Sequence, residues 1–253
     1  MKRPPKVDLD AFHTDLDTLQ LAFVREHYDA FVATAANEQW DHLPLLARLI
    51  EGEAAQRRDR AIARRIRLAR FPVKKTLDAF DWTWPKKINR QQVMNLFRLQ
   101  FVEQASNVIF VGGVGLGKSH LAIALGLRAC EERYPVLFAS AIDVVNTLAA
   151  AQAADRLKQG LNRYIKPRVL LLDELGYLPI DKTGADLLFQ IISQRYERGS
   201  TVITTNRVYR KWPEIFNNDA TLTSAVLDRL LHHAETVVIE GKSFRMKDAN
   251  PET

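Results

Sequence analysis

The sequence predicts an α/β fold in which helices cover a five-stranded parallel sheet and a small all-helical domain precedes it. From about residue 107 onward, short apolar runs alternate with helical segments, which is typical of parallel strands buried on both faces. The stretch Gly112–Ser119 fits the pattern Gly-x-x-x-x-Gly-Lys-Ser between the first apolar run and the first helical segment. Residues 7–70, by contrast, carry apolar side chains at helical spacing.

We expect the helical domain to span residues 1–70 and the α/β domain to span residues 71–253. Pro44, shortly after Asp41, marks the start of a helix. Pro72 is expected to end that helix, because the residue before a proline avoids the α region. Residues 72–87 are interpreted as an extended connector, and residues 90–103 as a further helix.

The α/β domain is expected to hold five strands and four intervening helices. The predicted strands are Val108–Val111, Val136–Ala139, Val169–Leu172, Thr201–Thr205 and Thr236–Ile239. The predicted helices are Lys118–Glu132, Asp143–Tyr164, Thr183–Arg198 and Thr221–His233, with Gly199 as the expected stop signal of the third.

Positive charge is concentrated in one part of the chain. The formal net charge is +6, and between Arg57 and Lys75 nine side chains are basic while only Asp59 is acidic. Lysine and arginine bind phosphates without reading base sequence, so this stretch favours duplex DNA as a partner over an ordinary solvated helix. The candidate DNA-binding side chains are Arg57, Arg58, Arg64, Arg65, Arg67, Lys74 and Lys75.

Composition also indicates the cellular location that we expect for the protein. Cys130 is the only cysteine, so an internal disulfide is impossible and a reduced, cytoplasmic location is expected, with Cys130 as a small buried residue. No apolar run approaches the ~20 residues of a membrane span, and the first residues do not resemble a signal peptide. We therefore expect no membrane partner.

The glycine-rich stretch predicts a phosphate-binding P-loop. Glycines let the backbone wrap around phosphate oxygens, and the amide dipoles of the following helix add positive potential. Lys118 is expected to reach the β- and γ-phosphates of ATP, and Ser119 to hold Mg²⁺. The candidate nucleotide-binding residues are Gly112, Gly113, Val114, Gly115, Leu116, Gly117, Lys118, Ser119 and His120.

Polar residues follow two further predicted strands. Asp173 and Glu174 come directly after Val169–Leu172, so they are expected at the carboxyl edge of the sheet, where such folds bind ligands. Asp173 would support Mg²⁺ there, and Glu174 would orient or deprotonate a water molecule. Asn206, after Thr201–Thr205, is a candidate to hold that water or the γ-phosphate, although a strand-end asparagine entering a turn is the alternative.

Two arginines remain as candidate phosphate contacts. Arg229 lies late in a predicted helix, where it could reach a neighbouring subunit's γ-phosphate, but an arginine paired with an acid on a helix surface is the more frequent case. Arg245 is a weaker candidate phosphate sensor. His232 and His233 have no partners at suitable spacing in the sequence, so we interpret them as surface or helix-end residues without a catalytic role.

Taken together, these motifs resemble those of the AAA+ ATPases. Within that superfamily the chain is similar to the IstB-type helpers of insertion-sequence transposition, which are close kin of the DnaC-type helicase loaders. The resemblance is carried by residues 76–81, 88–90, 173–177 and 241–245. Of these segments, the Leu-Gly-Tyr sequence that follows Asp173 and Glu174 is the one most specific to this family.

The resemblance implies a role for each motif. ATP would bind at residues 112–119 with Mg²⁺ at Ser119 and Asp173, Glu174 and Lys118 would be catalytic, Asn206 would be the first sensor, and Arg229 the arginine finger donated in trans. It also implies a homo-oligomer with ATP at its subunit interfaces that binds duplex DNA, helps choose the target and stimulates a partner transposase. AAA+ modules end in a helical lid, for which residues 241–253 are too few, so we expect little or no lid.

Two alternatives stay open at this point. A DnaC-type replicative helicase loader would share the same ATPase residues and differ in residues 1–70. A P-loop kinase acting on a small molecule is less favoured, because a monomeric kinase has no use for Asn206 together with an interface arginine at Arg229.

Overall fold

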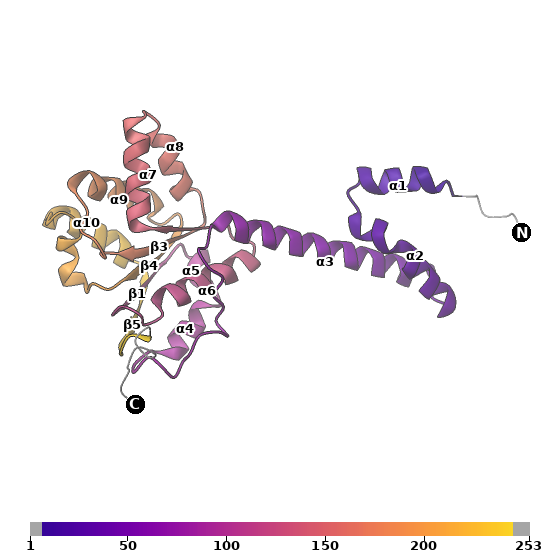
Figure 1. The fold of residues 1–253 in the computed structure, drawn as a ribbon, viewed down its shortest axis with the longest axis horizontal. Coiled ribbons are helices and arrows are strands. Elements are labelled where there is room, and N and C mark those ends of the chain that lie inside the picture. Colours follow the sequence, from indigo (N-terminus) through magenta and orange to yellow (C-terminus); the bar gives the residue numbers. More distant parts are fainter. Residues whose placement is uncertain (1–6, 245–253) are drawn as a thin grey trace, which may run out of the picture. The chain divides into compact units, whose positions relative to one another are not determined.

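The structure is a computed structural model, and it describes residues 7–244 of the chain. These residues fall into two compact units divided between Arg64 and Arg65 (Figure 1). The first unit contains α1 (Leu9–Thr18), α2 (Ala22–Asn37) and the greater part of α3 (His42–Ala69). The functional boundary between residues 70 and 71 stays a prediction.

Local sequence explains how the helices of the first unit begin and pack. The carboxylate of Asp8 accepts hydrogen bonds from the first free amides of α1, so it caps that helix. Gly52 of α3 lies directly against the ring of Phe23, where any side chain would overlap it, so glycine permits the close approach of α2 and α3. The carboxylate of Glu53 is buried beside it and accepts a hydrogen bond of 2.8 Å from the Phe23 amide and one of 3.0 Å from Arg57.

The boundaries of α3 follow its prolines. The helix begins at His42, so Pro44 lies in its first turn, and it ends at Ala69, three residues before Pro72. Arg70 then takes a left-handed φ of 61°. Within residues 7–244, no helix combines the length and the apolar character that crossing a membrane requires.

The second unit contains a five-stranded parallel sheet, which confirms the predicted α/β fold. Its strand order is β2-β3-β4-β1-β5. The strands are β1 (Asn107–Gly112), β2 (Val136–Ser140), β3 (Val169–Leu175), β4 (Ser200–Thr205) and β5 (Ala234–Ile239). All their carboxyl ends therefore meet at one edge of the sheet.

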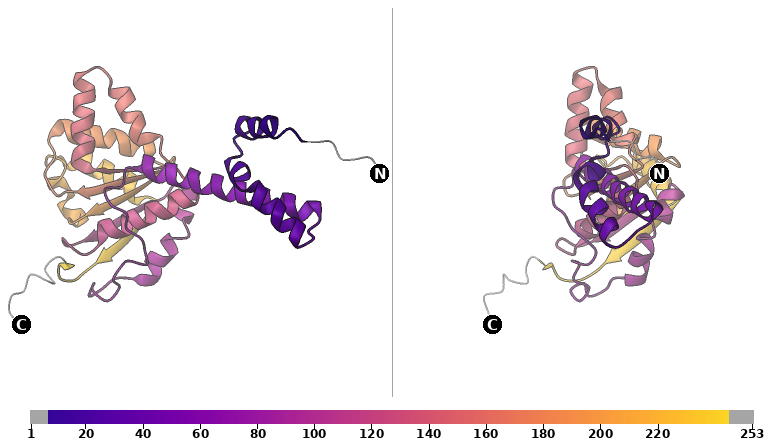
Figure 2. Two further views of the ribbon diagram at one scale, coloured as in Figure 1. Left: turned by 45° about the vertical axis from the view of Figure 1, so that its right-hand side comes forward. Right: turned by 90° about the vertical axis from the view of Figure 1, so that its right-hand side faces the viewer.

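Helices cover both faces of this sheet (Figures 1 and 2). One face packs against α7 (Ala141–Ala153), α8 (Leu157–Ile165), α9 (Lys182–Arg195), the 3₁₀ helix η1 (Tyr209–Glu214) and α10 (Ala220–Leu231). The other packs against α4 (Arg90–Leu96), α5 (Gln100–Glu103) and α6 (Lys118–Glu131). The connector at residues 72–87 contains turns but no helix or strand.

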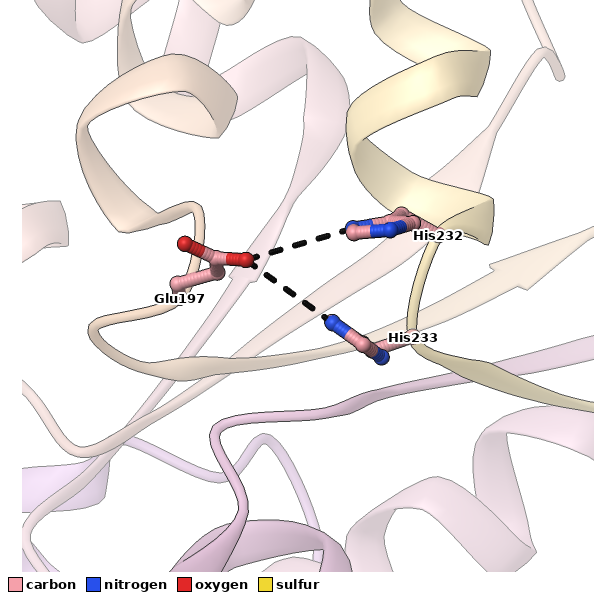
Figure 3. A group of neighbouring side chains, drawn as sticks. All are labelled: Glu197, His232 and His233. Atoms are coloured by element: carbon pink, nitrogen blue, oxygen red, sulfur yellow. Dashed lines mark ion pairs between the residues drawn. The ribbon is translucent and has the colours of Figure 1, made fainter.

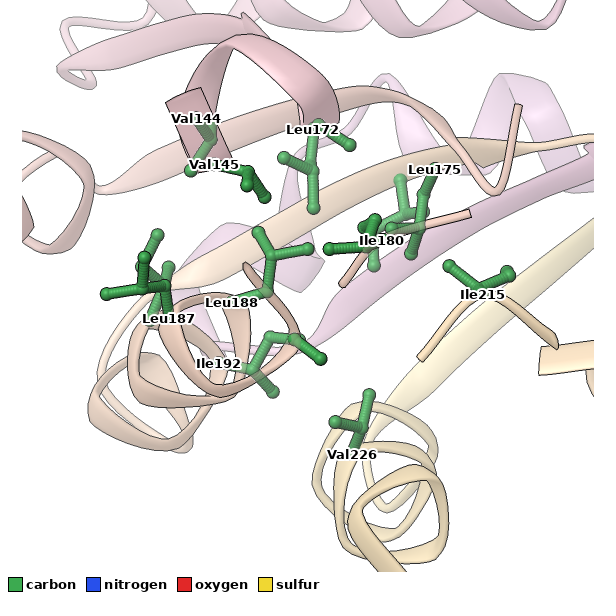
Figure 4. Close-up of a cluster of buried hydrophobic side chains, with 14 of the residues drawn as sticks. Val144, Val145, Leu172, Leu175, Ile180, Leu187, Leu188, Ile192, Ile215 and Val226 are labelled. Atoms are coloured by element: carbon green, nitrogen blue, oxygen red, sulfur yellow. The ribbon is translucent and has the colours of Figure 1, made fainter. Parts of the chain in front are cut away.

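Successive side chains along the strands point to opposite faces of the sheet and so contribute to two separate hydrophobic cores. Ile109 of β1 faces α7, α9 and α10, whereas its neighbour Val108 faces α4, α5 and α6. Figure 4 shows the first core, in which Leu172 of β3 packs near Val145 of α7 and Leu188 of α9. Because side chains on both faces of the inner strand β1 are buried, Val108–Val111 is a continuous apolar run, whereas the edge strand β5 exposes Glu235 and Val238.

Two predicted helices are each divided in the structure. The predicted helix Asp143–Tyr164 is α7 followed by α8, because Asp155 takes a left-handed φ of 53° and the Arg156 amide donates back to the Ala151 carbonyl at 2.8 Å. The predicted helix at residues 90–103 is α4 followed by α5, with Leu99 at a φ of 61° between them.

The prediction that Gly199 stops the helix now called α9 is wrong. That helix ends at Arg195, and Glu197, not the glycine, takes the left-handed conformation with φ of 56°. The amides of Arg198 and Gly199 both donate to the Arg195 carbonyl, at 2.9 and 3.0 Å. The helix end is therefore closed by loop amides without a glycine in the left-handed region.

Candidate nucleotide-binding site

The P-loop connects β1 to the first turn of α6. Gly115 and Gly117 have φ angles of 74° and 84°, which other residues adopt only with strain. A side chain at residue 117 would also place its Cβ 2.6 Å from the ring of Phe80, and one at residue 115 would overlap Ser243. The loop thus presents its backbone amides at the start of a 14-residue helix, which is a favourable site for phosphate.

Three elements converge on the carboxylate of Asp173 at the end of β3. The hydroxyl of Ser119, in the first turn of α6, donates to Asp173 Oδ1 at 2.8 Å. The hydroxyl of Thr204, on the neighbouring strand β4, donates to the same oxygen at 2.5 Å. Hydroxyl and carboxylate oxygens are the ligands that Mg²⁺ prefers, so Ser119 and Asp173 fit the metal that the sequence predicts here.

Glu174 lies on an irregularity of the strand. The pairing of β3 with β4 shifts register between Leu172 and Leu175, and Glu174 takes a left-handed φ of 60°. Its amide donates to the Thr204 hydroxyl at 3.0 Å, which fixes the bulge. Bulges redirect side chains, and strained non-glycine backbone of this kind clusters at functional sites. Here the bulge gives Glu174 an exposed side chain on the pocket wall.

Ser119, Glu174 and Thr204 line one pocket of about 610 Å³ at the carboxyl edge of the sheet. Its lining includes Lys118, Ser119, Glu174 and Asn206, so the structure brings together predicted P-loop, catalytic and sensor residues. The ammonium group of Lys118 donates to the Gly113 carbonyl at 2.7 Å, folded back onto its own loop.

Part of the pocket lining is aromatic and was not predicted. It contains Phe80, Trp84 and Phe244. The Trp84 indole donates to the Lys242 carbonyl at 2.9 Å, and the Phe244 amide donates to the Gly115 carbonyl at 2.9 Å. These contacts join segments up to 158 residues apart, so no local pattern could reveal them. A pocket that combines phosphate-binding groups with flat apolar side chains suits a nucleotide.

His120 links the P-loop helix to the connector. Its Nε2 lies 2.7 Å from the Thr76 carbonyl, and its ring contacts the edge of Phe80 at a centroid distance of 5.3 Å. His120 lines the pocket, but its described contacts hold the wall of the site in place. Its predicted role in nucleotide binding stays a prediction.

Arg229 is not among the described residues that line this pocket. It lies in the last turn of α10, just before the first residue of β5, and therefore at the amino edge of the parallel sheet. Its guanidinium donates to the Ala225 carbonyl at 2.9 Å and lies 5.0 Å from the centre of the Phe189 ring. Arg245 lies outside the described residues.

The predicted DNA-binding side chains differ in what they contact. The Arg57 guanidinium is engaged within the first unit, by Glu53 and by the carbonyls of Leu19 and Gln20. Lys75 lines the nucleotide pocket. Of the other predicted side chains, Arg58, Arg64, Arg67 and Lys74 are exposed and Arg65 is half-buried.

Cys130 is buried in α6, as the sequence suggested. Burial raises the pKa of its thiol to about 11. The thiol therefore stays protonated and unreactive at neutral pH.

Solved structures share the fold of the second unit. A crystal structure of the DnaC helicase loader covers 65% of this chain and 96% of its own, with a TM-score of 0.53 and 24% identity. A crystal structure of DnaI covers 68% of this chain and 93% of its own, with a TM-score of 0.57 and 18% identity. The structure of replication initiator DnaA bound to AMPPCP and single-stranded DNA covers 72% of this chain and 57% of its own. Its TM-score is 0.56 and its sequence identity is 23%.

Sequence relatives are closer and extend over most of the chain. An insertion sequence IS232 ATP-binding protein from Bacillus thuringiensis subsp. berliner is 38% identical over 93% of this chain and 94% of its own. An insertion sequence IS21 ATP-binding protein from Pseudomonas aeruginosa is 38% identical over 92% of this chain and 88% of its own. The model of the family described as IstB-like ATP binding protein matches residues 14–251. The chain therefore belongs to the IstB-like ATP binding protein family.

Proposed function

We propose that this protein is an ATP-dependent, DNA-binding helper of insertion-sequence transposition. It assembles on duplex DNA with ATP, helps select the target, stimulates a partner transposase, and hydrolyses ATP to disassemble. The observation that carries the proposal lies beside the P-loop, where Ser119 and Thr204 both donate to Asp173 and Thr204 also accepts from the Glu174 amide. The relatives named from insertion sequences supply the biological context.

The pocket supports hydrolysis of ATP through its own side chains. Lys118 would leave the Gly113 carbonyl to contact the β- and γ-phosphates. Mg²⁺ held by Ser119 and Asp173 would neutralise phosphate charge. Glu174 would orient and deprotonate the attacking water, and Asn206 would hold that water or the γ-phosphate from the adjacent strand.

Arg229 would act on the ATP of a neighbouring copy. Within one chain it sits at the amino edge of the sheet, opposite the carboxyl edge that holds the P-loop. A head-to-tail pair of subunits can bring opposite edges together, and an arginine supplied in trans stabilises the charge of the transition state. ATP would then be sensed at a subunit interface, and its hydrolysis would loosen the assembly.

Residues 1–70, with the following basic residues, are the proposed surface for DNA or partner binding. The exposed cations Arg58, Arg64, Arg67 and Lys74 carry the DNA proposal, with Arg65 at a half-buried position. Arg57 contributes less, because its guanidinium is already bound by Glu53 and two carbonyls. Contacts of this kind depend strongly on salt and weakly on base sequence.

Retention on duplex DNA tests the proposal. Wild-type protein should bind a long duplex more tightly with ATP than with ADP, and Lys118→Ala should lose that difference. Replacing Arg58, Arg64 and Arg67 by alanine should lower the slope of log affinity against log salt by about three, whereas Arg48→Ala serves as the control. Arg48 is a matched arginine on α3 that pairs with Glu51. Wild-type protein that shows no ATP-dependent retention at moderate salt would refute the proposal.

A replicative helicase loader is the second function considered, because the DnaC loader shares this fold over 96% of its own length. At 24% identity that similarity concerns the fold alone. Co-purification separates the two functions: a helper should retain its transposase, whereas a loader should retain a replicative helicase and no transposase.

A further inference from the structure

Three exposed side chains form a cluster far along the sequence from the P-loop. Figure 3 shows Glu197, from the loop after α9, facing His232 and His233, from the end of α10. Glu197 Oε1 lies 3.9 Å from Nδ1 of His232 and 3.8 Å from Nε2 of His233. Among residues 7–244 it is the one set of three such side chains whose ligand atoms all lie within 4.8 Å of one another.

This group of side chains could not be predicted from the sequence. The two histidines have no partner at metal-binding spacing along the chain, and Glu197 precedes them by more than thirty residues. The parallel sheet brings them together, because the segments that lead into β4 and β5 both lie at its amino edge. His232 and His233 are exposed residues at the end of α10, as the sequence predicted, and the structure adds Glu197 as their neighbour.

A buried asparagine holds the two segments in place. Asn107, at the start of β1 between β4 and β5, donates from its backbone amide to the His233 carbonyl at 2.7 Å. Its side-chain amide donates to the Leu230 carbonyl at 3.0 Å, and its side-chain oxygen accepts from the Thr201 amide at 2.9 Å. One side chain thus ties the end of α10 to the start of β4, so the cluster rests on ordered backbone.

The local charge favours a cation. His232 is the residue that ends α10, where the free carbonyls of a helix carry partial negative charge. Glu197 adds a full negative charge, and Asp228 adds another on the last turn of the helix. The neighbouring cation, Arg229, is turned toward the Ala225 carbonyl and the Phe189 ring.

We propose that Glu197, His232 and His233 bind one Zn²⁺ ion. Two imidazole nitrogens and one carboxylate are a known ligand set for zinc that leaves a fourth position for water. Ligands placed tetrahedrally at about 2.1 Å from zinc lie about 3.4 Å apart, and small rotations of exposed side chains bring the observed 3.8 and 3.9 Å to that value.

The site is separate from the Mg²⁺ site proposed for ATP. It lies at the amino edge of the sheet, whereas Ser119 and Asp173 lie at the carboxyl edge. The hydroxyl of Tyr196 lies 2.6 Å from Nδ1 of His232 and competes with a metal for that nitrogen. Bound zinc would fix the end of α10 and with it the position of Arg229, three residues earlier.

Metal titration of the full chain tests the site. Untagged protein without nucleotide, in excess Mg²⁺ to saturate oxygen-rich sites, should bind one equivalent of Zn²⁺ by calorimetry and give a tetrahedral Co²⁺ absorption band. Glu197→Gln and His233→Ala should each weaken Zn²⁺ binding by at least about tenfold. Tyr196→Phe should bind at least as tightly as wild type, and His42→Ala, which removes a different exposed histidine, should leave binding unchanged.

The ligands are exposed, so folding can be controlled independently. Thermal melting without metal should be the same for wild type, Glu197→Gln and His233→Ala, and zinc should raise the melting temperature of wild type alone. Wild-type protein that binds no zinc under these conditions, or a His233→Ala variant that binds it as tightly as wild type, would overturn the assignment.

Discussion

At the scale of single residues, Thr204 organises the candidate catalytic carboxylates. Its hydroxyl donates to Asp173 and accepts from the amide of Glu174, so one oxygen contacts both acidic residues. It is buried at the end of β4, in the strand next to β3. We therefore treat Thr204 as a positioning residue that acts through its two neighbours.

Replacing Thr204 by valine keeps the shape of the side chain and removes the hydroxyl. We expect kcat for ATP hydrolysis to fall about tenfold, because Asp173, a proposed metal ligand, would lose a hydrogen bond that orients it. The Kd for ATP should change little. Thr204→Ser retains the hydroxyl and should recover most of the activity. Steady-state hydrolysis with a separate nucleotide-binding measurement checks this, and an unchanged kcat in Thr204→Val would contradict the role.

Glu174→Gln removes the proposed base at nearly constant size. ATP hydrolysis should fall by about 100-fold or more, because general-base catalysis contributes at least that much. ATP binding should persist, since Lys118 and the P-loop are unchanged. Single-turnover hydrolysis and binding of a fluorescent ATP analogue check both expectations. Turnover close to the wild-type rate would exclude Glu174 as the base.

Local patterns predict those site residues that a short sequence encodes. The P-loop, Asp173, Glu174 and Asn206 each follow a predicted strand; the P-loop, Glu174 and Asn206 line one pocket, and Asp173 accepts a hydrogen bond from Ser119 of that pocket. The wall formed by Phe80, Trp84 and Phe244 depends on contacts between distant segments, so it needed the structure.

At the scale of elements, the first unit depends on the buried carboxylate of Glu53. Desolvation alone would raise the pKa of Glu53, but hydrogen bonds from Arg57 and from the amides of Phe23 and Val24 outweigh it and lower the pKa. A lowered pKa means that the ionised form stabilises the fold, and this contribution is complete above the pKa of the unfolded chain. It is lost as pH falls through the folded-state pKa.

Glu53→Gln should therefore destabilise the first unit at neutral pH by about 2 kcal/mol, since charge-assisted hydrogen bonds are lost in a buried place. The difference from wild type should shrink as pH drops below about 4, where the wild-type carboxyl also becomes protonated. Urea unfolding followed by helix content at several pH values measures it. Glu51→Gln, an exposed neighbour on α3, is the control. A difference that is constant with pH would contradict the role of the ionised carboxylate.

Strands were easier to predict than helix breaks. Each predicted strand overlaps an observed one, because continuous apolar runs report burial on both faces. The breaks within two predicted helices occur where Leu99 and Asp155 take left-handed conformations. Neither is glycine, so tertiary packing and not a local signal decides where these helices end.

At the scale of the whole molecule, two edges of the sheet carry different chemistry. The carboxyl edge carries the nucleotide pocket, and the amino edge carries Arg229 with the proposed zinc ligands. Such an arrangement suits a heterologous interface, in which one edge of a subunit meets the other edge of the next. If Arg229 acts in trans as proposed, each site would need a second copy to be complete, and ATP would control assembly.

A mixing experiment tests this most directly. The Arg229→Ala variant has an intact nucleotide pocket but lacks the arginine that would reach a neighbouring subunit. The Glu174→Gln variant is expected to bind ATP without hydrolysing it, and it still carries Arg229. Each variant alone should be nearly inactive as an ATPase on duplex DNA. In an equal mixture about a quarter of the interfaces would pair an intact pocket with an intact finger, so activity should return toward about a quarter of wild type. A mixture as inactive as its two components, under conditions where wild type turns over, would contradict the shared site.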